Sequence, residues 1–318
     1  MSQLPSSGTQ HVLRSGDYAA TIASIGATVR TLSHRGRDLV VPFDADQVRP
    51  SYRGATLAPW PNRIVDGKYR FGGKDYQTAL TEPARGHALH GLASWLEFTP
   101  VDKGPSHVTL AATIEPQTGY PWRVRVEASF VLDGSGLRHR VSGTNLSTED
   151  APWGASAHPY LVAGPGTVND WTLHLPASQV LTVTEDRLIP EGLQAVDAER
   201  SEQFDFRQPR TLGDVFIDHA YTDLHRDGAG QVRVAVTHPG GTGVEMVWDA
   251  SCPWVQIHTA DKPDPTLSRL GLAVEPMTCA PDAFNQDAYP YPTGMVTLAP
   301  GAQAEASWAI AALQGAAR

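Results

Sequence analysis

Apolar and polar residues alternate over many short stretches of this chain. Every second residue from Trp122 to Phe130 is apolar, and the residues between them are polar or charged. A period of two is typical of a β-strand with one buried face. The turn sequence Asp-Gly-Ser-Gly follows at 133–136, and the alternation resumes from Leu137 to Val141. These features together predict a β-hairpin.

The same alternation recurs elsewhere and predicts further strands at 108–114, 232–236, 244–248, 255–259 and 306–310. No segment of 11 or more residues has the periodicity of an amphipathic helix. With 29 Gly and 25 Pro between many short strands, the pattern predicts an all-β protein, a large antiparallel β-sandwich. No fixed-period repeat favours a propeller, and no linker divides the chain, so we expect residues 1–318 to form a single domain.

Composition narrows the functional classes. The 318 residues are 41% hydrophobic and 19% charged, and 25 Lys and Arg against 34 Asp and Glu give a formal net charge of −9. This balance argues against nucleic acid or an anionic membrane as a partner. The first 14 residues are polar, and no apolar run reaches the roughly 18 to 20 residues of a membrane span. We therefore predict a cytoplasmic protein, either a monomer or a homodimer.

Cysteine use indicates no metal or redox chemistry. The two cysteines, Cys252 and Cys279, belong to no CxxC motif and have no ligand cluster beside them in the sequence. Two reduced thiols are favoured over a disulfide. We expect neither a structural zinc site nor any other cofactor.

Polar residues occupy several strand positions in the C-terminal third of the chain. In the segment 272–277, Leu272 and Val274 share one face of a short strand, which places Glu275 on the other face. In the segment 255–259, Gln256 and His258 face away from the two apolar residues. A glutamate at a strand end is usually a solvated charge, so this pattern alone does not define a site.

Two histidines and an arginine lie in motifs with restricted backbones. His90 is followed by Gly91, and His158 precedes a proline, which confines its backbone to an extended conformation. Histidine exchanges protons near neutral pH, although a lone histidine is more often structural. Asn62 and Arg63 follow two prolines in a loop and offer the amide and guanidinium groups that a sugar would use. His87, three residues before His90, is interpreted as a supporting or surface group.

These motifs, in this order, resemble the aldose 1-epimerase (galactose mutarotase) family. The family pattern contains Asn-Arg-Ile, Leu-His-Gly, His-Pro-Tyr, an Asp, a Gln and a Glu, and it ends with Pro-Asp-Ala and Asn. The six matching motifs here are Asn62–Ile64, Leu89–Gly91, His158–Tyr160, Asp218–His219, Gln256, and Glu275 followed by Pro281–Asn285. One tripeptide is weak support, but six motifs in the correct order are a specific signal. The resemblance implies the galactose mutarotase-like supersandwich fold.

The resemblance also implies a role for each matched residue. Glu275 matches the general base that takes the proton of the anomeric hydroxyl, and His158 matches the general acid that protonates the ring oxygen. His90 matches a second histidine that holds the sugar. The matched positions that bind sugar hydroxyls are Arg63, Asp218 and Gln256, with Asn62 supporting Arg63. The expected partner is a small-molecule monosaccharide, and the reaction needs no metal or organic cofactor.

The chemistry supports a base and an acid independently of the resemblance. Opening a cyclic hemiacetal removes a proton from the anomeric oxygen and adds one to the ring oxygen. The reference pKa values of Glu and His, about 4.3 and 6.5, predict an ionised carboxylate and a partly protonated imidazole at neutral pH. The open aldehyde can then turn and close from its other face, which interconverts the α and β anomers of a free hexose.

Other functions stay open on the sequence. His258 stands where many family members carry an aromatic residue, and the segment 54–64 looks more like a bacterial subgroup that includes mutarotases for sulfonated glucose. An anionic hexose such as sulfoquinovose would need cationic donors, for which Arg53 and Arg85 are candidates. A glycoside hydrolase would use Asp218 and Glu275 as its carboxylate pair. A non-catalytic carbohydrate-binding protein would instead need an exposed platform from Trp60, Trp95 or Trp153.

Overall fold

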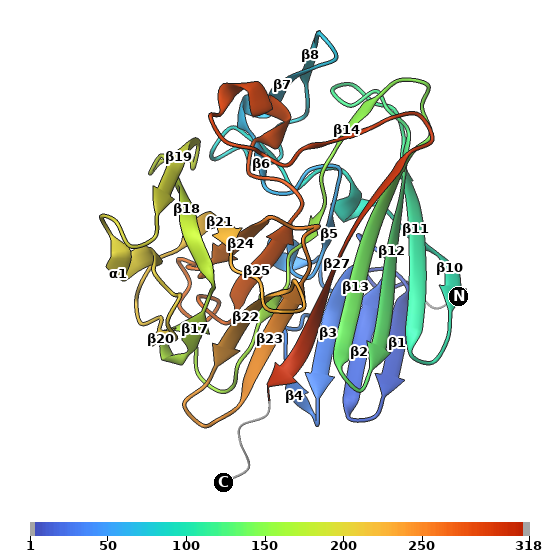
Figure 1. Ribbon diagram of the computed structural model, residues 1–318. Coiled ribbons are helices and arrows are strands. Elements are labelled where there is room, and N and C mark those ends of the chain that lie inside the picture. Colours follow the sequence, from blue (N-terminus) through green and yellow to red (C-terminus); the bar gives the residue numbers. More distant parts are fainter. Residues whose placement is uncertain (1–3, 314–318) are drawn as a thin grey trace.

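The structure is a computed structural model that describes residues 4–313 (Figure 1), so both ends of the predicted domain lie outside the described residues. Its largest sheet has nine antiparallel strands. In spatial order they are β10 (Thr99–Lys103), β11 (His107–Ile114), β12 (Val124–Asp133), β13 (Gly136–Asn145), β27 (Gln303–Leu313), β23 (Gly243–Trp248), β22 (Val232–Thr237), β17 (Thr172–His174) and β20 (Arg210–Thr211).

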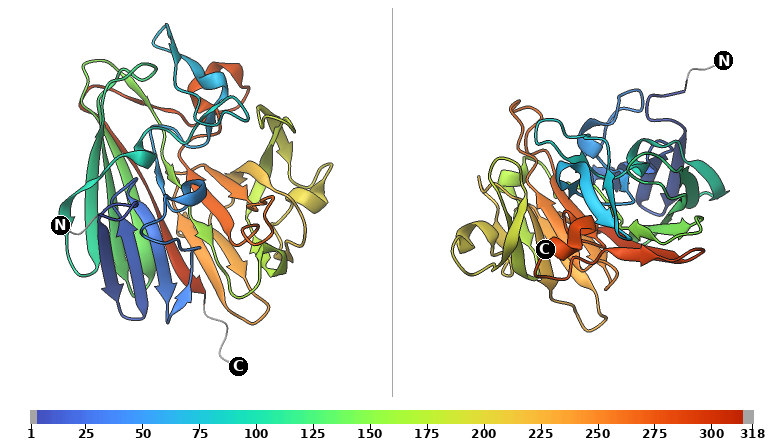
Figure 2. Two further views of the ribbon diagram at one scale, coloured as in Figure 1. Left: turned by 180° about the vertical axis from the view of Figure 1, so that it is seen from behind. Right: turned by 90° about the horizontal axis from the view of Figure 1, so that it is seen from above.

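Two further sheets lie against the nine-stranded one (Figures 1 and 2). The first contains β1 (Gln10–Ser15), β2 (Tyr18–Ala23), β3 (Thr28–His34) and β4 (Arg37–Asp38). The second contains six strands in the order β16 (Tyr160–Leu161), β25 (Leu272–Met277), β24 (Trp254–His258), β21 (Asp218–Leu224), β18 (Ala177–Val183) and β19 (Pro190–Ala195).

Short elements fill the connections. Four strand pairs are β5 (Thr56–Leu57) with β15 (Ser156–Ala157), β6 (Arg63–Ile64) with β9 (Ala88–Leu89), β7 (Lys68–Phe71) with β8 (Lys74–Gln77), and β14 (Ala151–Trp153) with β26 (Val296–Leu298). The helices are α1 (Ser201–Phe204) and the 3₁₀ turns η1 (Pro50–Tyr52), η2 (Val65–Gly67), η3 (Ala93–Trp95), η4 (Val168–Asp170) and η5 (Ala283–Ala288). None of the helices within residues 4–313 has the length and apolar character of a membrane span.

One apolar core joins the sheets. Strands β1 and β2 pack on β11 and β12, and in the view from behind the blue strands lie over the green ones (Figure 2). Ile257 and Val274 of the six-stranded sheet belong to the same buried cluster as Val234, Trp248 and Trp308 of the nine-stranded sheet. Burial of facing apolar surfaces is the main stabilising term of such a sandwich. The predicted all-β sandwich is confirmed.

The strand predictions agree closely with the structure. The predicted hairpin is β12 and β13, joined at Asp133 and Gly136. One difference is that Trp122 is buried but precedes β12, which begins at Val124. The backbone N–H of Arg123 donates to Ser147 Oγ at 2.7 Å, and a donor used in this way is not available to a strand ladder. Cys252 and Cys279 are both buried and free.

The register of the six-stranded sheet gathers its polar side chains on one face. Gln256 lies opposite Glu275 on the neighbouring strand, and Asp218 lies opposite His258. Residues that are directly opposite on adjacent strands point to the same face, as do residues two apart on one strand. These four side chains therefore share the outer face, away from the core that contains Ile257. The predicted orientation of Gln256 and His258, away from the apolar residues of β24, is confirmed.

Candidate active site

A cavity of about 380 Å³ opens on the outer face of the six-stranded sheet. Loops from the first third of the chain cover this face, so its polar residues are buried although they point away from the main core. The cavity is lined by Ser51, Tyr52, Asn62, Arg63, Glu82, Arg85, Leu89, His90, His158, Tyr160, Phe216, Asp218, Gln256, His258, Asp261, Lys262, Pro263 and Glu275. All seven residues predicted for the site are among them.

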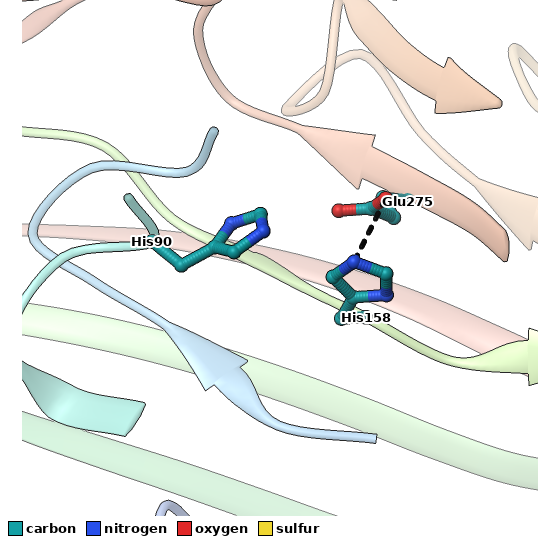
Figure 3. A group of neighbouring side chains, drawn as sticks. All are labelled: His90, His158 and Glu275. Carbon is teal, nitrogen blue, oxygen red and sulfur yellow. Dashed lines mark ion pairs between the residues drawn. The ribbon is translucent and has the colours of Figure 1, made fainter. Parts of the chain in front are cut away.

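Glu275 and His158 form a buried acid–base pair in the cavity. His158 Nε2 lies 3.4 Å from Glu275 Oε1, and their side chains are only 7% and 2% exposed (Figure 3). His158 Nδ1 and Glu275 Oε2 are buried with no hydrogen-bond partner among the described residues. Buried polar atoms are normally satisfied, and exceptions gather at functional sites.

The backbone around His158 fixes the direction of its ring. His158 lies between β15 and β16, where its N–H donates to the Ala55 carbonyl at 3.0 Å and its own carbonyl accepts the Gly54 N–H at 2.8 Å. The ring stacks on Tyr160, with centroids 4.9 Å apart and planes at 19°. Pro159 keeps the preceding residue extended. The imidazole is thus held from both its backbone and one ring face.

His90 approaches the same point from the opposite wall (Figure 3). Its ring centroid is 5.1 Å from that of His158, and its backbone has a left-handed φ of 60°. Gly91 follows, where a Cβ would lie 2.2 Å from the Ala58 carbonyl oxygen, so this close approach requires glycine. His90 Nδ1 accepts the Asn62 N–H at 3.2 Å. The neutral ring therefore carries its proton on Nε2 and acts as a donor.

Arg63 is held by a carboxylate that the sequence analysis did not single out. Its Nε and Nη2 donate to the two oxygens of Glu82 at 2.7 and 3.0 Å, a bidentate pair. Asn62 Oδ1 accepts the Arg63 N–H at 3.0 Å, as expected for a supporting residue. Arg85 Nη1 also donates to Glu82, at 2.9 Å. Nothing in the sequence spacing relates Glu82 to Arg63, because loop closure alone brings them together.

The third group lies at the ends of β21 and β24. Gln256 Nε2 donates to Asp218 Oδ1 at 2.7 Å, and His258 Nδ1 lies 3.8 Å from the same oxygen. Gln256 Oε1 has no partner among residues 4–313, so it is available as an acceptor for a bound hydroxyl. This set offers both donors and acceptors a short distance along the sheet from Glu275.

Burial changes the proton affinities of the reactive groups. It raises the pKa of Glu275 well above its ordinary range, and the Asp218 carboxylate acts in the same direction. It lowers the pKa of His158 to about 3, with a smaller contribution from His258. Burial and the neighbouring His158 likewise lower the pKa of His90. Reference pKa values predicted an ionised Glu275 and a partly protonated His158, whereas the buried site favours the neutral forms of both groups because ions are poorly solvated there.

One group in residues 4–313 has the composition of a metal site. Ligand atoms of His90, His158 and Glu275 lie within 4.8 Å of one another. The hydrogen bond from Asn62 occupies the Nδ1 lone pair of His90 and leaves a proton on Nε2. A metal needs a free nitrogen lone pair, so this donor set fits proton transfer better than metal binding.

Other side chains near the cavity had weaker sequence signals. His87 is fully buried and is therefore not a surface group. Its Nδ1 accepts the Asp66 N–H at 3.2 Å. Arg53 lies outside the cavity lining and sits over the Tyr160 ring at 5.7 Å. Lys262 does line the cavity, although no sequence motif marked it.

The chain belongs to the aldose 1-epimerase family, whose model matches residues 9–310. It is therefore an enzyme of the isomerase class in a family that acts on sugars.

Particular relatives agree with this membership. The chain is 34% identical over 281 residues to the uncharacterized protein YihR of Escherichia coli (strain K12), a match that covers 88% of this chain and 87% of that protein. It is 28% identical over 326 residues to the galactose mutarotase of Mus musculus, with 91% of each chain covered.

Solved structures show the same fold. The aldose epimerase homologue of C. elegans superposes with a TM-score of 0.83 at 19% identity, covering 97% of this chain and all of the other. The galactose 1-epimerase of Lactobacillus acidophilus gives a TM-score of 0.79 at 15% identity, with 96% and 95% covered.

Replacing Glu82 tests whether the buried ion pair holds this wall of the cavity. Glu82→Ala leaves the Arg63 side chain, which is 9% exposed, without its bidentate partner. Removing one member of a buried pair typically costs about 3–5 kcal/mol, so we expect the free energy of unfolding in urea to fall by that amount. Asp75→Ala is the control, because its pair with Arg70 is largely exposed and contributes about 1 kcal/mol at most. Equal losses in both variants would contradict this account.

Proposed function

We propose that the protein is a mutarotase that interconverts the α and β anomers of a free hexose. The observation that carries the proposal is the pairing of buried Glu275 and His158, 3.4 Å apart, in a cavity lined mostly by polar and charged side chains. Such a cavity, with a few convergent polar groups of perturbed pKa, is the usual form of a small-molecule site. Membership of the aldose 1-epimerase family supports the same reaction.

In the proposed reaction Glu275 takes the proton of the anomeric hydroxyl while His158 gives one to the ring oxygen. The bond between C1 and the ring oxygen breaks, and the anomeric carbon becomes an aldehyde. Rotation about the C1–C2 bond exposes the other face of the aldehyde. His158 then recovers the proton from the hydroxyl that attacks C1, and Glu275 returns a proton to the carbonyl oxygen. Each positioned proton transfer typically contributes about 10²- to 10⁴-fold to the rate.

The two groups carry one proton between them throughout this cycle. A second proton would place a positive charge in the buried pair, and loss of the only proton would leave a buried anion, so burial disfavours both. Burial raises the pKa of Glu275 and lowers the pKa of His158, which favours Glu275 as the holder of the shared proton in the free protein. Its transfer to His158 generates the reacting pair.

The remaining predicted residues would hold the sugar. His90 donates from Nε2 toward the ring-oxygen side, and Arg63 presents the part of its guanidinium not used by Glu82. Asp218 and Gln256, joined at 2.7 Å, would bind hydroxyls along the sheet. Because these contacts exist before the sugar arrives, the site is preorganised for one orientation of the ring.

The two rival classes have less support. A glycoside hydrolase would use Asp218 and Glu275 as its two carboxylates, which leaves His90 and His158 without a clear role. A binding protein needs an exposed aromatic platform, and of its three candidates Trp60 and Trp153 are buried while Trp95 is 50% exposed. Neither class has a use for a buried Glu–His pair. The predictions of a cytoplasmic location and of a monomer or homodimer stay predictions.

Loss of the base tests the reaction directly. Glu275→Gln keeps the size of the side chain but cannot accept the anomeric proton, so we expect kcat for the interconversion of α-D-glucose and α-D-galactose to fall by about 10²- to 10⁴-fold. Polarimetry of freshly dissolved sugar, corrected for the spontaneous rate, measures this. Glu245→Gln is the control, since Glu245 pairs with Arg233 in the nine-stranded sheet and should leave the rate unchanged.

Each alternative gives a different result in the same assays. Binding of sugar by calorimetry without any acceleration would identify a carbohydrate-binding protein. Release of nitrophenol from aryl hexosides, lost in Glu275→Gln, would identify a glycoside hydrolase. Acceleration by the wild type that survives Glu275→Gln would exclude Glu275 as the base.

The pH dependence of kcat/KM tests the shared proton. Below the acid limb the pair carries two protons and has no base, and above the alkaline limb it carries none and has no acid, so the profile should be bell-shaped. Because burial lowers the pKa of His158 to about 3, we expect no loss between pH 7 and pH 5. An acid limb near pH 6.5, the ordinary histidine value, would contradict this protonation scheme.

Lys262 favours an anionic hexose as a second candidate substrate. Of the three Lys and Arg side chains that line the cavity, Arg63 and Arg85 are both paired with Glu82. Lys262 has no ion pair within the described chain, and its side chain is exposed at the cavity. An unpaired ammonium can bind a sulfonate or phosphate on the substrate. Arg53, one of the two candidates from the sequence, is outside the lining.

Replacing Lys262 distinguishes the two substrate classes. If the substrate is anionic, Lys262→Ala should raise KM for a 6-sulfonated or 6-phosphorylated glucose by about tenfold, the size of one hydrogen bond to a charged group, and leave glucose unaffected. Exchange-spectroscopy NMR measures both rates. Lys103→Ala, on the exposed edge strand β10, is the charge-matched control. An equal effect on neutral and anionic sugars would rule out this role.

A further inference from the structure

The chain from Asn62 to Asp66 carries Arg63 along one wall of the cavity, and side chains accept most of its backbone N–H groups. His90 Nδ1 accepts from Asn62 at 3.2 Å, and Asn62 Oδ1 accepts from Arg63 at 3.0 Å. Asp282 Oδ1 accepts from Val65 at 2.8 Å, and His87 Nδ1 accepts from Asp66 at 3.2 Å. Within this segment, only Arg63 and Ile64, which form β6, pair with a neighbouring strand, β9. The position of this segment therefore depends on a few individual side chains.

Asp282 forms two hydrogen bonds with this segment. Its carboxylate accepts the Val65 N–H, and its own backbone N–H donates to the Arg63 carbonyl at 2.8 Å. The carboxylate also accepts the Tyr289 hydroxyl at 2.6 Å and Asn285 Nδ2 at 2.9 Å. Asp282 is 3% exposed. Both the residue that carries the guanidinium and a residue two positions later are thus bonded to one aspartate.

The carboxylate of Asp282 is not used for the role that its position suggests. Asp282 is the N-cap residue of η5, where an aspartate usually accepts an N–H of the first helical turn. It makes no such side-chain bond, and it reaches instead to Val65, 217 residues earlier in the chain. Besides Asn285 of η5, the carboxylate therefore holds a loop that is distant in the sequence.

Backbone strain explains why the segment 62–66 needs these hydrogen bonds to keep its conformation. Asn62 and Asp66 have φ values of 54° and 55°, and they flank the residues that Asp282 holds. Residues in this left-handed region are strained and persist where the surroundings determine them. Without the bond from the Val65 N–H to the Asp282 carboxylate, only the backbone bond to the Arg63 carbonyl remains, and the segment can relax and carry the guanidinium away from the cavity.

We propose that Asp282 is a positioning residue, whose carboxylate sets Arg63 for sugar binding by holding the Val65 N–H. The proposal rests on the sugar-binding role of Arg63 in the proposed function. Asp282 does not line the cavity and so acts only through the segment. Its effect should fall on sugar affinity rather than on the proton transfers of Glu275 and His158.

Kinetics of Asp282 variants test this coupling. Asp282→Ala should raise KM about tenfold with kcat nearly unchanged, and Asp282→Asn should recover most of the affinity because its amide oxygen can still accept the Val65 N–H. In an Arg63→Lys background, which lacks the bidentate fork, Asp282→Ala should cost less than twofold. Asp170→Ala is the control, since it removes the capping box of η4 and should leave KM unchanged.

Two results of these measurements would overturn the proposal. Additive effects of Asp282→Ala and Arg63→Lys on kcat/KM would show that Asp282 does not act through Arg63. A loss of thermal stability with KM unchanged would make Asp282 a structural residue only.

A second readout is independent of activity. In ¹⁵N NMR spectra the Arg63 Nε–H, which bonds Glu82 at 2.7 Å, should shift in Asp282→Ala and not in Asp170→Ala; an unshifted resonance would refute the positioning. If the wild type fails to accelerate mutarotation, the proposed function fails, and this resonance still decides the inference.

Discussion

The burial of Glu275 on the outer face of a sheet is the constraint on which the rest of the site depends. A carboxylate that is 1% exposed loses its hydration, and it can be kept there only if its neighbours share its proton or charge. His158 lies 3.4 Å away and supplies that partner. The same burial that makes the group costly shifts its pKa, so stability and reactivity have one physical origin.

The cover over this face is built from polar loops, and their backbone groups need partners of their own. Those partners are largely the site residues. His90 accepts the N–H of Asn62, and the Arg63 fork is satisfied by Glu82. The loops therefore cannot be described as a passive lid over a finished site. The same hydrogen bonds close the cavity and fix the tautomer of His90 and the plane of the guanidinium.

The sandwich supplies rigidity from the opposite face of the same strands. Ile257 and Val274 are fully buried in the main core, and each is adjacent in sequence to a polar residue of the cavity. Because side chains alternate along a strand, fixing one face fixes the other. A shift of register by one residue would exchange the two faces, so apolar packing in the core also determines which polar groups meet the substrate. The single domain predicted for residues 1–318 remains a prediction, which this continuous core supports.

The sequence by itself determined the strands, the sandwich and seven of the residues that line the cavity, because alternation and ordered motifs are local properties of the chain. It did not determine the partners that close the cavity, since Glu82 reaches Arg63 and Asp282 reaches Val65 only through loops that the fold brings together. It also suggested an ionised Glu275 and a partly protonated His158, two charge states that burial disfavours. Reference pKa values describe groups in water, and the removal of water from both groups is a property of the tertiary structure alone.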